Sequence, residues 1–184
     1  MYERPTRHRL WMAAGLLAGA CLCGDSGLRA SVVVPMSLTQ LVDEAALVVD
    51  GTVEDVRVGN GPSGPERMVQ VRVADRWKGA ADAVVYVRLA GGRLGRTETR
   101  VLGVPEVDPG DRRVWFLVPH PRGGYSVLGL HQGALPATTG PDGVTRVLAP
   151  GIDTAARGSV TRLPRTITAL ADHVRALAAT AGNR

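Results

Sequence analysis

Few residues of this 184-residue chain have the type and spacing that catalysis requires. Beyond the first thirty residues there are three histidines, His120, His131 and His173. We expect them in a turn, at a strand end and in a helix, and none has the H-E-x-x-H spacing of a zinc site. The sequence also contains no G-x-S-x-G nucleophile elbow and no metal-binding aspartate cluster. It therefore predicts no catalytic residues, no metal ligands and no cofactor.

Two short pairs are the best candidates for ligand contacts. Trp77 and Lys78 end a predicted strand, where a barrel would present an aromatic ring and a cation at its rim. The alternative is that Trp77 caps the core while the Lys78 stem lies along it. His131 and Gln132 lie between two predicted strands and would offer polar contacts in a cleft, or would simply satisfy a loop. Both pairs are therefore predicted binding residues with a structural alternative.

Two other patterns have simpler explanations. Gly91-Gly-Arg-Leu-Gly95 would cradle a phosphate only if a helix began directly after it, and no helix is predicted there. The glycines instead favour a tight turn. Asp108 and Asp111 flank a Pro-Gly pair, which is typical of a turn.

Residues 1–30 have the layout of a secretory signal peptide. A positive segment, Arg4 to Arg9, precedes an apolar run over residues 10–23, and Ala30 offers a small residue for cleavage. The apolar run is shorter than the about 20 residues that span a bilayer. The sequence thus predicts export to the periplasm or the medium, with no membrane span in the mature chain.

A lipid anchor is the alternative to free export. Ala18-Gly-Ala-Cys21 is similar to the box that directs lipid attachment to cysteine, although bacterial lipoproteins usually carry leucine where this chain has Ala18. Cys21 is therefore a candidate lipidation site. Cys21 and Cys23 are the only cysteines, so cleavage after Ala30 would leave 154 residues without a disulfide.

The basic charge of the chain does not point to nucleic acid. The formal net charge is +5, and residues 1–30 hold four arginines against two acids, which leaves +3 for the rest. The remaining basic residues are interleaved with Asp and Glu and form no run. We expect no nucleic-acid partner.

Two long strands dominate the predicted fold. Residues 46–58 and 68–79 alternate apolar and polar side chains with a period of two, and residues 59–66 between them are predicted to be a hairpin loop. The alternation slips by one residue at Glu54-Asp55, which predicts a β-bulge of the kind that lets long strands coil into barrels.

The other predicted elements are shorter. Ser37 and Gln40 have the spacing of a capping box, so a helix begins there. Residues 113–118 are apolar on both faces, which predicts the most buried strand. The remaining expectations are strands at 82–90, 96–102 and 125–130, a last hairpin with its tip at 141–143, and a C-terminal amphipathic helix.

This order predicts a mainly β fold: a small OB-like barrel, closed or partly open, with a short N-terminal helix and an amphipathic C-terminal helix. We divide the chain by function as follows: signal peptide 1–30, β-barrel domain 31–148, linker 149–162, and helix 163–181 packed on the barrel.

Taken together, these motifs resemble a family of exported bacterial proteins of unassigned function. The resemblance covers most of Met36 to Val147. It lies in the order of Leu-x-x-Leu-Val, Ala-Leu-Val-Val-Asp-Gly-Thr-Val, Arg-Trp-Lys-Gly, Gly-Asp-x-x-Val-Trp-Phe-Leu and Gly-Leu-His-Gln-Gly. The resemblance implies an exported domain.

A more distant likeness is to the netrin-like domain of tissue inhibitors of metalloproteinases. Asp50-Gly-Thr-Val and Trp77-Lys-Gly79 are the matching pieces, and the likeness implies an OB-fold barrel. Those inhibitors chelate zinc through an N-terminal cysteine, which the chain after Ala30 lacks, so the likeness does not imply inhibition by that route.

Three hypotheses follow. The first is an exported, non-enzymatic binding or accessory module that contacts a protein or glycan of the cell envelope. The second is an envelope hydrolase or protease-inhibitor-like protein with a site near His131, and the third is a structural protein anchored through Cys21. The sequence leaves the ligand and the oligomeric state open.

Overall fold

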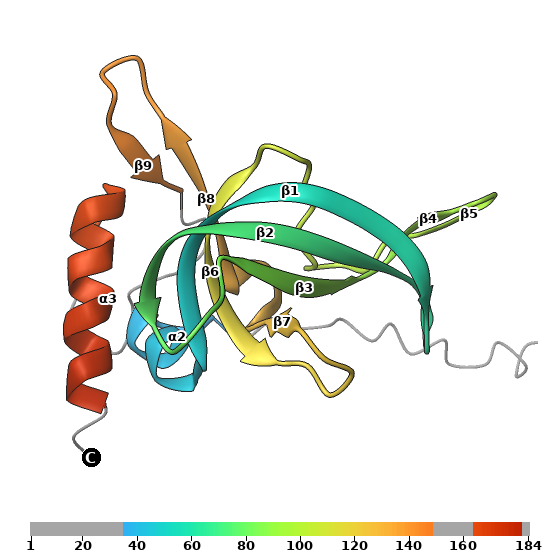
Figure 1. Ribbon diagram of the computed structural model, residues 1–184, viewed down its shortest axis with the longest axis horizontal. Coiled ribbons are helices and arrows are strands. Elements are labelled where there is room, and N and C mark those ends of the chain that lie inside the picture. Colours follow the sequence, from blue (N-terminus) through green and yellow to red (C-terminus); the bar gives the residue numbers. More distant parts are fainter. Residues whose placement is uncertain (1–34, 149–163, 182–184) are drawn as a thin grey trace, which may run out of the picture. The chain divides into compact units, whose positions relative to one another are not determined.

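The computed structural model describes residues 35–148 and 164–181. The expected signal peptide, the Cys21 lipidation site and the 149–162 linker lie outside these residues. The described part is mainly β, with two α-helices and one 3-10 turn (Figure 1). The elements are, in chain order, α2 (Leu38–Glu44), β1 (Leu47–Gly61), β2 (Gly64–Lys78), β3 (Val84–Ala90), β4 (Gly92–Leu94), β5 (Thr97–Thr99), β6 (Arg112–Pro119), β7 (Tyr125–Val127), η2 (Leu130–Gly133), β8 (Ala134–Thr139), β9 (Thr145–Val147) and α3 (Ile167–Ala181).

Five strands form a ring through their pairings. The order runs β1-β2-β3-β7-β6, and β6 pairs with β1 again. All of these pairings are antiparallel except that of β3 with β7, which is parallel and joins only two residue pairs, Val87 with Tyr125 and Arg88 with Ser126. This short seam leaves the barrel partly open. The OB-like prediction is therefore confirmed in its partly open form, and the strands do not make a closed barrel.

The ring encloses one hydrophobic core. Side chains from all five ring strands meet there, including Val49, Val71, Val87 and Trp115, with Tyr125 partly buried beside them. The alternation along each strand supplies these inward positions, because successive side chains of a strand point to opposite faces.

A second core lies on the outer face of the barrel. Outward-facing side chains of β1, β6 and β8, such as Val48, Phe116 and Leu135, pack against α2 and α3. Strand β6 thus contributes Trp115 and Leu117 to the inner core and Val114 and Phe116 to the outer one. This confirms the prediction that residues 113–118 are buried on both faces.

Helix α2 begins as predicted. The Ser37 hydroxyl accepts the Gln40 amide at 3.2 Å, and the Ser37 amide donates to the Gln40 side chain at 2.8 Å, which completes the capping box. Helix α3 begins at Ile167 rather than at residue 163. Thr166 pairs with Arg146 in a β-bridge and its hydroxyl accepts the Ala169 amide, so it ends the extended segment and caps the helix.

The predicted loop at 59–66 is wrong. Pairing of β1 with β2 continues to Gly61 and Gly64, so the turn contains only Pro62 and Ser63. Backbone pairing needs no apolar side chains, and this end of the hairpin is exposed, so the hydrophobic pattern carries no signal there. The bulge at Glu54 is confirmed by a register shift between Val53 and Asp55.

Two further expectations need correction. The 125–130 strand ends at Val127, because Gly129 and Leu130 adopt left-handed backbone angles and lead into η2. The segment predicted as a glycine turn plus a strand at 96–102 is instead a small hairpin, β4–β5. Its turn has Gly95 at φ +60°, and a positive φ at the first central residue matches a type II′ turn.

Candidate functional site

The structure gives Trp77 and Lys78 clear packing roles. Trp77 is buried in the outer core, and its indole N–H donates to Asp75 at 3.0 Å. The Lys78 ammonium donates to the backbone carbonyls of Val42 and Asp43 at 2.5 and 3.1 Å, at the last turn of α2. A cation at this position satisfies the open carbonyls of a helix C-terminus. A ligand-binding role for the pair stays a prediction.

Gln132 and His131 lie together in η2, and they have different environments. The Gln132 side chain is buried, and its carbonyl oxygen accepts the Met36 amide at 2.7 Å, so it ties η2 to the chain that enters α2. His131 is partly exposed, and its backbone N–H donates to the Gly103 carbonyl at 2.8 Å. His131 is therefore next to the loop that follows β5.

This loop presents an exposed leucine. The Val104 amide donates to the Val101 carbonyl at 3.2 Å, which closes a four-residue turn with Leu102 and Gly103 at its centre. Gly103 has φ +83°, the value that the third position of a type II turn requires. Leu102 occupies the second position and is 89% exposed.

Leu130 lies against the same turn in an unusual conformation. Its φ of +60° is the only positive φ of a non-glycine residue in the two described ranges. The left-handed conformation costs a non-glycine residue about 1–2 kcal/mol. A Cβ built on Gly103 would lie 3.0 Å from Leu130 Cδ1, so Leu130 covers Gly103 beside Leu102.

We call the surface formed by Val101, Leu102, Leu130 and His131 the loop patch. It contains three of the six large apolar residues that are exposed in the described part of the chain. Monomeric proteins rarely gather exposed apolar side chains without a reason, and such patches often mark contact surfaces. The sequence indicates His131 as a contact residue but not Leu102, because the pattern of residues 96–102 predicts only an exposed strand.

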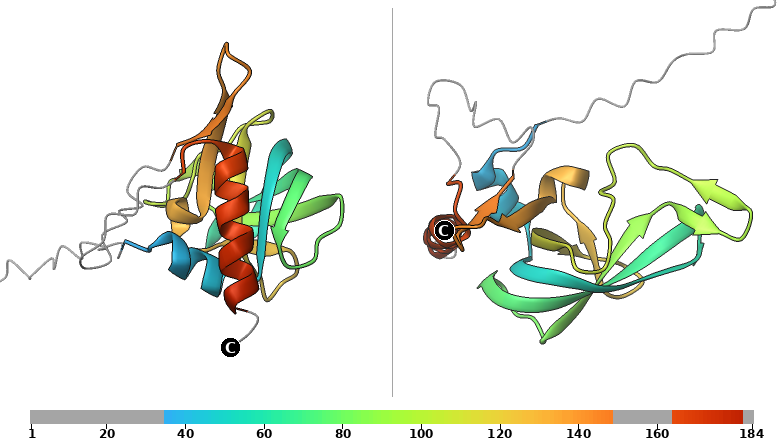
Figure 2. Two further views of the ribbon diagram at one scale, coloured as in Figure 1. Left: turned by 90° about the vertical axis from the view of Figure 1, so that its left-hand side faces the viewer. Right: turned by 90° about the horizontal axis from the view of Figure 1, so that it is seen from above.

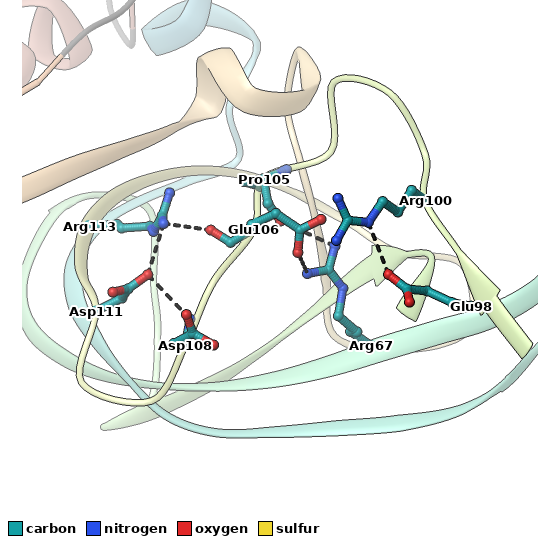
Figure 3. A network of polar contacts seen from close by, with 8 residues as sticks. All are labelled: Arg67, Glu98, Arg100, Pro105, Glu106, Asp108, Asp111 and Arg113. Carbon is teal, nitrogen blue, oxygen red and sulfur yellow. Dashed lines mark hydrogen bonds and ion pairs between the residues drawn. The ribbon is translucent and has the colours of Figure 1, made fainter. Parts of the chain in front are cut away.

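An arginine network fixes the chain that follows Leu102 and Gly103 (Figure 3). Arg67 points from β2 toward the barrel interior and is 8% exposed. It donates to the Glu106 carboxylate at 2.8 Å and to the Pro105 carbonyl at 3.2 Å. Arg113 on β6 donates to the Glu106 carbonyl at 2.6 Å and to Asp111 at 2.8 Å.

The network ties the 100–111 loop to β2 and β6. Pro105 and Val107 of this loop are buried, and Val107 belongs to the inner core. Within the described chain, the Nε atoms of Arg67 and Arg113 are buried without an acceptor. Leaving a buried donor unsatisfied costs about 1–3 kcal/mol. The two guanidinium groups are therefore oriented to bind the loop, and each leaves its Nε–H without an acceptor.

The same network lowers the pKa of Asp111. Burial raises the pKa of its carboxyl group, but hydrogen bonds from the Arg113 side chain and the Asp108 amide outweigh burial, so the pKa lies below its usual 3.8. Asp111 therefore remains ionised and paired with Arg113 at neutral pH.

A hollow lies beside the start of β6 and along β8. It has a volume of about 380 Å³ and is lined in part by Arg112, Thr139 and Leu148. Arg112 is already engaged, because it donates to both carboxylate oxygens of the buried Asp50 at 3.0 and 2.6 Å. The hydrogen bond to Asp50 raises the pKa of Arg112. Arg112 thus neutralises the buried carboxylate of Asp50 on β1.

No three His, Cys, Asp or Glu side chains gather as a metal site in residues 35–148 and 164–181. His120, His131 and His173 fall on three different elements: the β6–β7 turn, η2 and α3. None of the helices in the described ranges is both long and apolar enough to cross a membrane.

A comparison of the chain with models of protein families and with curated proteins finds no match.

Proposed function

We propose that this chain is an exported, non-enzymatic binding or accessory module of the bacterial cell envelope, and that it contacts a protein partner through the loop patch. The observation that carries the proposal is Leu102, an aliphatic side chain held almost fully in solvent at the tip of a hydrogen-bonded turn. An exposed aliphatic side chain favours association because a partner that covers it removes apolar surface from water.

The geometry of the patch favours binding because it is preorganised. The backbone hydrogen bond from His131 to Gly103 joins the turn to η2, and Gln132 joins η2 to the chain before α2. Arg67 and Arg113 fix the loop from below. A surface that is already ordered loses little conformational entropy on binding.

The class of function rests on two further arguments. The resemblance of residues 36–147 to exported bacterial proteins, and the layout of residues 1–30, support a location in the envelope. The loop patch itself holds one titratable side chain, His131, whereas catalysis needs several that converge.

The experiment compares two exposed leucines. We would immobilise the full chain and its Leu102→Ser and Leu148→Ser variants, and expose each to envelope extract. Leu148 is 56% exposed and lies away from the patch, at the β6–β8 hollow, so it is the matched control. We expect the same protein to be retained by the wild type and by Leu148→Ser and lost by Leu102→Ser. Retention by Leu102→Ser, or loss from both variants, would sink the proposal.

A hydrolase or protease-inhibitor-like activity near His131 is the second candidate, since this side chain is partly exposed in the patch. A turnover or inhibition that His131→Ala abolishes while Leu102→Ser leaves it intact would support that candidate over the binding module. If the immobilised chain retains a glycan instead of a protein, the binding-module hypothesis stands and the partner is a glycan.

A further inference from the structure

We infer that the partner is acidic, and that its carboxylates contact the arginines of the β4–β5 hairpin while an aliphatic side chain contacts Leu102. This inference rests on the proposed function, whose patch it extends. We call residues 92–100 the arm. The arm leads directly into Val101 and Leu102, so the arginines and the leucine belong to one continuous stretch of the chain.

The arm carries positive charge that nothing else in the described structure neutralises. Its charged residues are Arg93, Arg96, Glu98 and Arg100, which gives a net charge of +2. Glu98 is paired with Arg100 at 3.0 Å. Arg93 and Arg96 are exposed and form no ion pair with any residue of the described ranges.

Most other exposed arginines of the described surface are already paired. The pairs are Arg57 with Asp55, Arg72 with Glu54, Arg122 with Glu66, Arg146 with Asp142, and Arg175 with Asp75. The arm thus keeps two arginines, Arg93 and Arg96, without an ion pair, although Arg93 lies opposite Glu98 in the β4–β5 pairing. Complementary charge at the edge of an apolar contact sets partner choice and speeds association.

The arm is held in place at its base. The Gly91 amide donates to the Pro65 carbonyl at 2.8 Å, and a Cβ on Gly92 would lie 3.0 to 3.1 Å from side-chain atoms of Val58 and Arg67. The backbone of the arm thus lies directly on β1 and β2. Figures 1 and 2 show it projecting at the end of the β1–β2 hairpin that is far from α3, where neither helix covers it.

The dimensions fit an extended protein segment. Arg96 is at the tip of the arm and Leu102 is six residues further along, which corresponds to a span of at most about 20 Å. An extended segment of about six residues that alternates acidic and aliphatic side chains would reach both Arg96 and Leu102. A membrane surface fits less well, because stable anchoring needs more basic residues or more apolar area than the loop patch and the three arginines of the arm supply.

The test uses a defined probe. A fluorescein-labelled peptide of alternating aspartate and leucine, about eight residues long to cover the span, is titrated with the full chain and followed by fluorescence anisotropy. We expect saturable binding that weakens as salt is raised through about 0.15 M. An Arg93→Ser, Arg96→Ser double variant should bind about five- to tenfold more weakly, since exposed ion pairs are individually modest.

The matched control is an Arg76→Ser, Arg165→Ser double variant. These two arginines are also exposed and form no ion pair in the described structure, and they lie outside the arm. We expect this control to bind the peptide within about twofold of the wild type. Equal losses in both double variants, no binding of the peptide, or equal binding of a lysine–leucine peptide would each overturn the inference.

Three further results separate the inference from the proposed function. If vesicles of anionic phospholipid bind in an arm-dependent way and the peptide does not, the occupant is a membrane and the inference is overturned. If the arm variant is unaffected while Leu102→Ser still loses the envelope partner, the inference fails and the binding module stands. If Leu102→Ser and Leu148→Ser retain the partner equally, the proposed function fails whatever the peptide does.

Discussion

Arg67 shows how a single side chain fixes the surface above it. The residue is on an inward-facing position of β2, where a hydrophobic side chain would be the usual choice, and its guanidinium reaches the Pro105 carbonyl and the Glu106 carboxylate. Glu106 is largely exposed, whereas Pro105 is buried. The bond to Pro105 is therefore the one that water cannot easily replace.

We predict that Arg67→Met lowers the free energy of unfolding by about 2 kcal/mol, because it leaves the buried Pro105 carbonyl without a donor. Urea unfolding measures this change. The control is Arg100→Met, which removes an exposed partner of Glu98 and should change the same free energy by no more than about 0.5 kcal/mol. Equal effects of the two substitutions would contradict the role given to Arg67.

Asp142 gives a pH-dependent prediction at the tip of the β8–β9 hairpin. A side-chain hydrogen bond from Arg146 and a backbone hydrogen bond from Val144 lower the pKa of Asp142 from 3.8 to about 2. Because the folded pKa is depressed, the ion pair stabilises the hairpin above the unfolded pKa and this contribution is lost as the pH falls toward 2. An NMR titration of the Asp142 carboxyl carbon should have its midpoint near pH 2.

The matched variant for this titration is Arg146→Gln, which should move the midpoint up toward 3.8. A wild-type midpoint already at 3.8 would show that the pair does not form in solution.

The candidate site was only partly predictable at this scale. The sequence indicates His131 because it lies between predicted strands, and the structure places His131 in the loop patch. Leu102 was missed because its exposure depends on the Gly103 turn and on the hydrogen bond from His131, 28 positions along the chain. Contacts between distant segments leave no periodic signal in the sequence.

At the scale of the elements, β1 is paired along both of its edges in its first half. Residues Leu47 to Thr52 pair with β6, and the pairing with β2 runs from Val48 to Gly61. Gly51 lies where both pairings overlap. A Cβ there would come within 2.6 Å of Val71 Cγ1 and 2.8 Å of the Arg72 carbonyl oxygen, so only glycine permits this close approach.

We predict that Gly51→Ala lowers the free energy of unfolding by about 2 kcal/mol, since the clash involves backbone that cannot move aside. Gly59→Ala on the same strand is the matched control, because a Cβ at Gly59 meets no atom within 4 Å. The control should alter stability by at most about 0.5 kcal/mol. Denaturant unfolding of both variants tests the pair, and a stable Gly51→Ala variant would contradict the strand geometry.

The predictability of the elements follows the burial of their side chains. The half-buried middles of β1 and β2, the doubly buried β6 and the capped α2 have strong periodic or capping signals, and the structure has them as expected. The ends of the β1–β2 hairpin and the β4–β5 arm are exposed, so their pairing depends on backbone and turn geometry alone. The conformation of Leu130 could not be predicted for another reason: leucine rarely adopts a left-handed backbone conformation.

At the scale of the whole described fold, the helices and the loop patch use different parts of the barrel. Both helices pack on the outer face formed with β1, β6 and β8, where Leu41 and Leu170 are fully buried. Figure 1 shows α3 and the β4–β5 arm at opposite ends of the long β1–β2 hairpin. The helices therefore stabilise the barrel without covering the surface that we propose for binding.

The central claim is that the loop patch is the surface that touches the partner, and photo-crosslinking tests it most directly. A benzophenone side chain would replace Leu102 in one full-length variant and Leu148 in another, and both would be irradiated in envelope extract. We predict one specific protein adduct from position 102, suppressed by an excess of wild-type chain but not by an excess of the Leu102→Ser variant, and none from position 148. Adducts from both positions, or from position 148 alone, would contradict the account.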